Sequence, residues 1–109
     1  MLPSQHRINR GEDFRRILRS GVKFRSALGT VALAPTSGPF RVGVIVSKAV
    51  GNAVLRNRVK RMVRAAARER ADALAGWEMV VRCSESAKDL IFSEILSFID
   101  EALTKARSS

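Results

Sequence analysis

The residues best suited to bind a polyanion are concentrated in residues 47–70, which read SKAVGNAVLRNRVKRMVRAAARER. This segment holds eight of the twenty Lys and Arg residues of the chain, and its first acid is Glu69. An ordinary solvated helix mixes charges of both signs and is supported by acid–base pairs one turn apart. The absence of such pairs therefore favours a surface that binds phosphate groups.

A helix over residues 53–70 would separate this segment into two faces. Its Ala, Leu, Arg, Lys and Met residues favour a helix, and no Gly or Pro interrupts it. At about 100° per residue, the predicted buried face consists of Leu55, Val59, Met62, Val63 and Ala66. The predicted exposed face consists of Arg56, Asn57, Lys60, Arg61, Arg64 and Arg68. Arg58 falls beside the apolar sector, where it could pair locally or orient its neighbours.

Gly51 and Asn52 interrupt the chain just before this helix. Asn52 is a suitable N-cap because its side-chain oxygen can accept a hydrogen bond from a free backbone amide. The remaining amides and the positive end of the helix dipole could also hold a phosphate. A simple turn explains the two residues equally well, so both interpretations stay open.

Few residues could perform acid–base or metal chemistry. The basic part of the chain contains only Glu12, Asp13 and His6 as candidates, whereas a nuclease needs acids that hold metal or a paired acid and base. Glu12 and Asp13 are explained by the dipole of a helix that starts there, and His6 by an exposed position on a polar arm. Cys83 and Trp77 are interpreted as core residues. We therefore expect no catalytic residue and no protein metal site.

Length and charge limit the classes of function. The 109 residues suit one domain, and the net charge of +10 suits a partner that is nucleic acid or an anionic membrane. Residues 1–68 hold 15 Lys and Arg against two acids, whereas residues 69–109 hold 5 against 8. No apolar run approaches the roughly 20 residues of a membrane span, and the amino terminus lacks the apolar region of a signal peptide. We expect a cytoplasmic protein that does not bind membranes.

Hydrophobic patterns predict the remaining elements. Residues 1–8 form an extended arm that Ile8 anchors, and residues 12–20 form a helix that packs Phe14 and Leu18 in the core. Residues 22–34 and 40–47 are predicted to pair as an antiparallel hairpin. Gly29 and Gly43 within them mark bulges or close approaches of another backbone.

The carboxyl-terminal part is predicted to contain a strand and a helix. Residues 77–83 form the strand, so that a strand, a helix and a strand follow one another as a crossover unit. Residues 86–89 offer a capping box for the last helix. Its predicted core stripe consists of Leu90, Ile91, Ile95, Leu96, Phe98, Ile99 and Leu103. Residues 105–109 should fray, and the whole chain should form one compact α+β unit.

The central block VGVIVSKAVGNAVLRNRVKRMVR resembles the protein subunit of bacterial ribonuclease P, because Arg56, Asn57 and Arg58 spell its RNR signature. A strand, the SK and GNAV segments and the RNRxKRxxR helix occur in one unbroken order. The amino-terminal match consists of Arg7, Ile8, Asp13, Phe14 and Gly21. The resemblance implies a single domain over residues 1–109 with an αβββαβα layout, a small mixed sheet and a left-handed βαβ crossover, the ribosomal protein S5 domain 2-like fold.

The resemblance also implies a function. The ribonucleoprotein would remove the 5′ leader from precursor tRNA by endonucleolytic hydrolysis, with the RNA subunit as catalyst and Mg²⁺ held mainly by RNA. The protein would bind the RNA subunit 1:1, bind the leader and support activity at low Mg²⁺, and it would be inactive alone. The alternatives are a structural, ribosomal-type RNA-binding protein, a DNA-binding protein and a membrane-active helix. The RNR signature beside GNAV favours ribonuclease P over the ribosomal-type protein. A DNA-binding protein would need base-specific side chains and usually a dimer element, and a membrane-active helix would need bulkier apolar residues than Leu55 followed by Val, Met and Ala.

Two surfaces follow from this resemblance. The residues expected to face the catalytic RNA are Arg56, Asn57, Arg58, Lys60, Arg61, Arg64 and Arg68, with Lys48 and Asn52 at the edge. The residues expected in the leader cleft are Phe14, Leu18 and Arg15. Leu18 and Ala32 stand where relatives often carry further aromatics, and Ala49 stands where a second lysine is common. Since the chain has no tyrosine, its leader contacts should be thinner or arranged differently.

Overall fold

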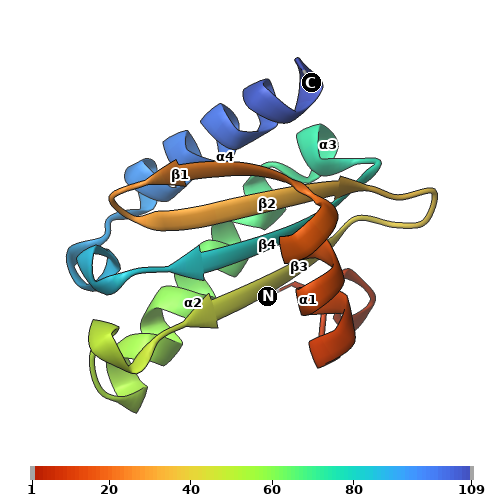
Figure 1. Ribbon diagram of the computed structural model, residues 1–109. Helices are drawn as coiled ribbons and strands as arrows, with labels where there is room; N and C mark the ends of the chain where they lie inside the picture. Colours follow the sequence, from red (N-terminus) through yellow and green to blue (C-terminus); the bar gives the residue numbers. More distant parts are fainter. Residues whose placement is uncertain (1, 109) are drawn as a thin grey trace.

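Four strands form one mixed sheet in the computed structural model, which describes residues 2–108 (Figure 1). The strands are β1 Val22–Ser26, β2 Gly29–Pro35, β3 Arg41–Val46 and β4 Trp77–Cys83. Their order is β1-β2-β4-β3, in which β2 pairs antiparallel with both β1 and β4, while β3 runs parallel to β4. The two central strands, β2 and β4, are therefore far apart in the sequence.

Helices cover both faces of this sheet. The long helices α2 Ala53–Glu69 and α4 Phe92–Arg107 lie on one face, and α1 Gly11–Ser20 lies on the other (Figure 1). The shorter pieces are α3 Ala71–Leu74 and the 3₁₀ turns η1 Ser4–His6, η2 Lys48–Val50 and η3 Glu85–Asp89. No helix of residues 2–108 is long and apolar enough to cross a membrane.

The crossover from β3 through α2 to β4 joins parallel neighbours and is left-handed, as the resemblance implies (Figure 1). The predicted hairpin of residues 22–34 with residues 40–47 is wrong. Residues 22–34 form two strands that pair with each other, and β4 lies between β2 and β3. Residues 78–81 of β4 are buried on both faces, which is typical of a central strand.

The main core lies between the sheet and the layer of α2 and α4. The predicted buried face of α2 is confirmed for Val59, Val63 and Ala66, while Leu55 and Met62 are partly buried against the same core. Trp77 is also only partly buried there. In α4 the confirmed core residues are Ile95, Phe98, Ile99 and Leu103, with Leu96 partly buried.

Both ends of α4 differ from the sequence prediction. Residues 86–89 belong to η3 and form no capping box; the helix begins at Phe92, where the Glu94 carboxylate accepts a hydrogen bond from the Ile91 amide at 3.1 Å. Ile91 consequently lies outside the stripe, with 56% of its surface exposed. Residues 105–107 do not fray, since Arg107 donates to the Ala73 carbonyl oxygen at 3.1 Å. Residue 109 lies outside the described residues.

The amino-terminal arm is folded against the sheet. Ile8 is buried, as predicted, and its amide donates to the Val42 carbonyl oxygen at 2.9 Å. The arm is not simply extended, because Leu2 is buried ahead of the turn η1. His6 stacks on Phe40 with ring centroids 4.1 Å apart, and its Nδ1 lies 2.7 Å from the Phe40 carbonyl oxygen. The interpretation of His6 as an incidental surface residue is therefore wrong.

Two glycines allow close packing around β2 and β3. Gly29 has a φ of 139°, and a Cβ there would overlap the Arg82 carbonyl oxygen, so the predicted close approach of a backbone is confirmed. At Gly43 the close neighbour is a side chain, because an added Cβ would overlap the ring of Phe14. This second contact lets α1 lie directly on the sheet.

Candidate nucleic-acid interface

The start of α2 is fixed by a side-chain cap. Asn52 Oδ1 accepts a hydrogen bond from the Leu55 amide at 3.0 Å, which confirms the predicted N-cap. Gly51, with a φ of 151°, makes the turn that leads into it. The Asn52 side-chain nitrogen has no partner within residues 2–108, so its two N–H donors remain available to an anion. Lys48 is exposed in η2, shortly before the cap.

The solvent side of α2 carries the predicted charged residues, which we call the α2 basic surface: Arg56, Asn57, Arg58, Lys60, Arg61, Arg64 and Arg68. Asn57, Arg58, Arg61 and Arg68 are exposed, whereas Arg56, Lys60 and Arg64 are half-buried. Across residues 2–108, none of these side chains forms an ion pair or hydrogen bond. Arg58 also remains unpaired, so it adds to the charged surface and does not pair locally.

Arg64 shares its surroundings with an arginine of the amino-terminal arm. Burial, together with the nearby Arg7 charge, lowers the pKa of Arg64 from its ordinary value. Arg7 is held in place by its Nε, which donates to the Leu2 carbonyl oxygen at 2.9 Å. Two guanidinium groups kept close together are unfavourable unless an anion offsets their repulsion. Arg7 is thus a further candidate for binding an anion. The sequence analysis named it only as part of the amino-terminal match and did not include it among the binding residues.

A groove of about 830 Å³ follows these arginines along α2. Its lining residues are Leu2, Arg7, Arg61, Arg64, Ala65, Arg68, Glu69 and Phe92. Three of these residues are apolar, four are cations and one is an acid. The groove therefore suits a negatively charged backbone with some apolar surface, as nucleic acid has.

The second predicted surface lies on the opposite face of the sheet, beside α1. Ile17 is fully buried there, while Phe14 and Leu18 are only partly buried, so the prediction that both belong to the core holds in part. They pack on a small cluster formed by Ile8, Ile17, Ala32, Ala34 and Val80. Arg15 follows Phe14 directly in α1, and its side chain is exposed. The predicted leader-cleft residues therefore lie together on α1, on the side of the sheet opposite α2.

On the same face of the sheet as α1, a row of residues is aligned across the four strands. Strand pairing aligns Arg25 of β1 with Thr30 of β2, Thr30 with Arg82 of β4, and Arg82 with Ile45 of β3. Sequence reasoning missed Arg25 and Arg82 because alternation along one strand does not reveal which strands are neighbours. Correct pairing of the strands would have identified them.

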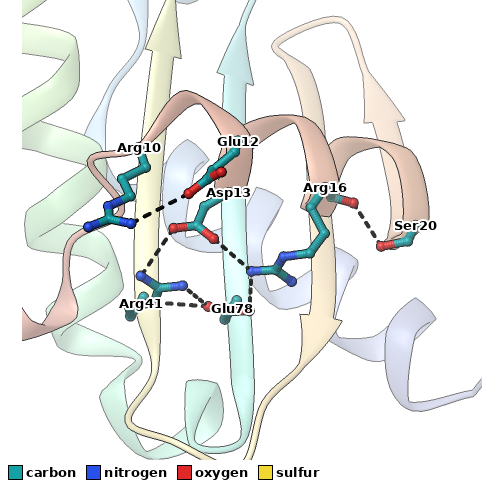
Figure 2. A network of polar contacts seen from close by, with 7 residues as sticks. All are labelled: Arg10, Glu12, Asp13, Arg16, Ser20, Arg41 and Glu78. Carbon is teal, nitrogen blue, oxygen red and sulfur yellow. Dashed lines mark hydrogen bonds and ion pairs between the residues drawn. The ribbon is translucent and has the colours of Figure 1, made fainter.

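Four charged side chains hold α1 on the sheet (Figure 2). Glu78, only 5% exposed, accepts from Arg16 of α1 at 3.0 Å and from the Arg41 Nε at 2.9 Å. Asp13 accepts from Arg16 at 3.2 Å and from Arg41 at 3.5 Å. The hydrogen bond from Arg16, the largest influence, and the charge of Arg41 lower the pKa of Asp13. The presence of an acid at residue 13 is therefore explained by these ion pairs as well as by the dipole of α1.

The remaining reactive groups are occupied or neutral. Burial raises the pKa of the Cys83 thiol to about 11, which keeps it protonated at neutral pH. Residues 2–108 contain no group of three or more His, Cys, Asp and Glu side chains that could hold a metal ion. What the two surfaces offer is unpaired cations and a partly exposed aromatic ring, the groups that bind single-stranded nucleic acid.

Comparisons with known proteins point to one family. The Ribonuclease P family model matches residues 2–107. The chain is 40% identical over 107 residues to the ribonuclease P protein component of Beutenbergia cavernae, covering 95% of this chain and 90% of that protein. It is 32% identical over 109 residues to that of Halalkalibacterium halodurans, covering 97% and 92%.

Solved structures agree with these sequence matches. The RNase P protein of Staphylococcus aureus superposes with a TM-score of 0.79 at 30% identity, covering 91% of this chain and 93% of that one. The RNase P protein of Thermotoga maritima gives a TM-score of 0.76 at 22% identity, covering 89% and 94%. The second match shows that the fold is shared.

Proposed function

Because the chain belongs to the ribonuclease P protein family, we propose that it acts in tRNA maturation as the protein component of that ribonucleoprotein, bound 1:1 to the RNA subunit in the cytoplasm. The observation that carries this function is the α2 basic surface, whose cations are all unpaired within residues 2–108. Its buried opposite face fixes the direction in which those cations point. The reaction is removal of the 5′ leader from precursor tRNA.

The α2 basic surface binds the RNA subunit. Arg side chains present forked donors that match phosphate oxygens, and each contact releases condensed counterions. The half-buried Arg64 and the nearby half-buried Arg7 supply two partly desolvated charges at this surface. By offsetting phosphate repulsion between two RNAs, the protein reduces the amount of Mg²⁺ that the complex needs.

Hydrolysis belongs to the RNA subunit, and the protein alone is inactive. Mg²⁺ in proteins prefers carboxylate ligands and bound water. The acids near the two surfaces do not suit Mg²⁺, because each is already paired with arginine. Asp13 and Glu78 form ion pairs with Arg16 and Arg41. Glu12 forms an ion pair with Arg10 at 3.5 Å. These acids fit a structural role, and the metal that cleavage requires is held mainly by RNA.

The cleft beside α1 binds the single-stranded leader. Phe14 offers a partly exposed ring for one base, Leu18 extends the apolar wall, and Arg15 supplies a charge at the rim. Stacking on aromatics over a basic groove is how proteins usually hold single-stranded RNA. The α2 basic surface and the cleft lie on opposite faces of the sheet, so one protein can contact the RNA subunit and the leader together.

The test is cleavage of a precursor tRNA at low, roughly physiological Mg²⁺ with a bacterial ribonuclease P RNA alone, the protein alone, and both. We expect release of the leader only from the combination, since the protein supplies the screening that Mg²⁺ otherwise provides. Cleavage by the protein alone would show that it contains a catalytic site. Binding of the RNA without stimulation of cleavage would support a purely structural RNA-binding protein instead.

A further inference from the structure

The groove along α2 is lined by three segments that are far apart in the sequence. The amino-terminal arm contributes Leu2 and Arg7, and the first residue of α4 contributes Phe92. The residues from α2 are Arg61, Arg64, Ala65, Arg68 and Glu69. Its volume of about 830 Å³ falls within the roughly 300–1,000 Å³ of sites that enclose small organic ligands. The groove is therefore large enough to receive an organic ring together with a charged group.

Phe92 brings an exposed aromatic ring to this groove. The exposed large apolar side chains of residues 2–108 are Val54, Ile91 and Phe92, of which only Phe92 is aromatic. It is 37% exposed, and within the described residues its ring stacks on no other ring. The helix start that carries it is fixed, because the Ile91 amide donates to the Glu94 carboxylate at 3.1 Å. The ring is thus held in place and has a free surface on which a ligand can stack.

Four cations line the groove with this ring, against the single acid Glu69. Within the described residues, Arg61, Arg64 and Arg68 form no ion pair or hydrogen bond, and Arg7 donates only to the Leu2 carbonyl oxygen. Burial, followed by the nearby charge of Arg7, lowers the pKa of Arg64. A phosphate bound between these guanidinium groups would offset their repulsion and accept their hydrogen bonds.

The groove lies beyond the RNR signature, on the carboxyl-terminal half of α2. None of Arg56, Asn57 and Arg58 lines it. The exposed Arg58 nevertheless stands one turn before Arg61 and within about 60° of it around the helix. An RNA strand that contacts the signature can therefore continue directly into the groove, which makes the groove an additional binding position on the same helix.

We propose that the groove holds one unpaired nucleotide of the RNA subunit, with its base stacked on Phe92 and its phosphates bound by the arginines. This inference rests on the proposed function, because it names a nucleotide-binding position at the surface that binds that RNA. An unpaired nucleotide fits because it joins an accessible ring face to an anionic phosphate, whereas the bases of a duplex are stacked on one another. A second copy of the chain fits less well, since it would bring a net charge of +10 to a cationic groove.

The experiment measures the affinity of the full chain for a bacterial ribonuclease P RNA over a range of salt concentrations. F92A removes the ring and F92W keeps an aromatic side chain. I91A is the matched control, because Ile91 is the adjacent residue, is 56% exposed and does not line the groove. Urea unfolding checks the fold of each variant; where F92A is destabilised, F92L replaces it, because Leu keeps apolar bulk without a ring. Chemical probing of unpaired bases, with and without each protein, locates the nucleotide.

F92A should weaken binding about tenfold, the effect of losing one stacked base. Its logarithmic salt slope should equal that of wild type, since no phosphate contact is lost. F92W and I91A should bind within about twofold of wild type. One base that is reactive in the free RNA should be protected by wild type and F92W but not by F92A. Removing that base from the RNA should weaken wild-type binding about tenfold and leave F92A binding unchanged.

Four results would overturn this inference. Equal binding by F92A and I91A would show that the ring holds no base, while weaker binding by R61A/R68A would leave the proposed function intact. A loss in F92A with a smaller salt slope would show that the ring only positions the arginines. Dimers of wild type that F92A abolishes would show that a second copy fills the groove. No binding of the RNA by wild type would contradict the proposed function, and this inference with it.

Discussion

Glu78 is the buried carboxylate through which α1 is held on the sheet. It stands on the central strand β4 and accepts from Arg16 of α1 and Arg41 of β3 (Figure 2). The apolar contact beneath α1 is small, since only Ile17 of the helix is fully buried. The ion pairs therefore add to this apolar contact in attaching α1, and they help to fix the position of Phe14 and Leu18.

Replacement of Glu78 by Gln should lower the free energy of unfolding by about 2 kcal/mol, because two arginines lose a charged acceptor while retaining partial contact with water. Urea unfolding measures the loss. The matched control is E12Q, since Glu12 is exposed and faces Arg10 at 3.5 Å; its effect should stay within about 0.5 kcal/mol. Equal effects of the two variants would contradict the role of Glu78.

Asp13 should make the stability depend on pH in the acid range. Its pKa is lowered below the ordinary value of 3.8 by the hydrogen bond from Arg16. The ionised group therefore stabilises the fold above that value, and this contribution is lost as the pH falls through the lowered pKa. Urea midpoints measured from about pH 5 to pH 2 should decline less steeply for D13N than for wild type. Parallel curves would show that Asp13 contributes nothing.

The α2 helix depends on its cap as well as on its buried face. Asn52→Ala removes the acceptor of the Leu55 amide, so thermal unfolding should reveal a loss of about 1 kcal/mol. Asn57 offers a matched control, because it is exposed within the same helix and forms no hydrogen bond in the part of the chain described. N57A should leave stability unchanged or raise it slightly, since Ala favours helices.

The exposed side of α2 should contribute to binding without contributing to stability. R61A/R68A removes two exposed cations that line the groove, so affinity for the RNA subunit should fall and its logarithmic salt slope should decrease by about 2. Unfolding should change by less than about 0.5 kcal/mol. The charge-matched K88A/R107A should keep most of the affinity; an equal loss would indicate a general charge effect.

The whole molecule is built around β4, which pairs with strands on both sides and is covered by helices on both faces. Its residues Met79, Val80 and Val81 are at most 1% exposed. Amide hydrogen exchange should therefore be slowest in β4 and in the adjoining β2, because their opening requires global unfolding. It should be fastest in the turns η1 and η3. Faster exchange in β4 than in the edge strand β1 would contradict this organisation.

The sequence alone determined the features that depend on near neighbours. Helical periodicity separated the buried and charged faces of α2, and Asn52 marked its start, because a helix turn and its cap involve residues within four positions of one another. The RNR signature then indicated the family, which the match over residues 2–107 confirms. The resemblance also supplied the left-handed crossover, which the general rule for such connections would have reversed.

Tertiary structure alone decided which distant residues meet. Residues 40–47 look like a partner for the preceding strand, yet β4 takes that place because it is the segment that buries both faces. That pairing places Arg25 and Arg82 on either side of Thr30, and it places Glu78 between Arg16 and Arg41. Strand order and ion pairs of this kind join residues far apart in the chain, so their energies depend on the complete packing and leave no local pattern to read.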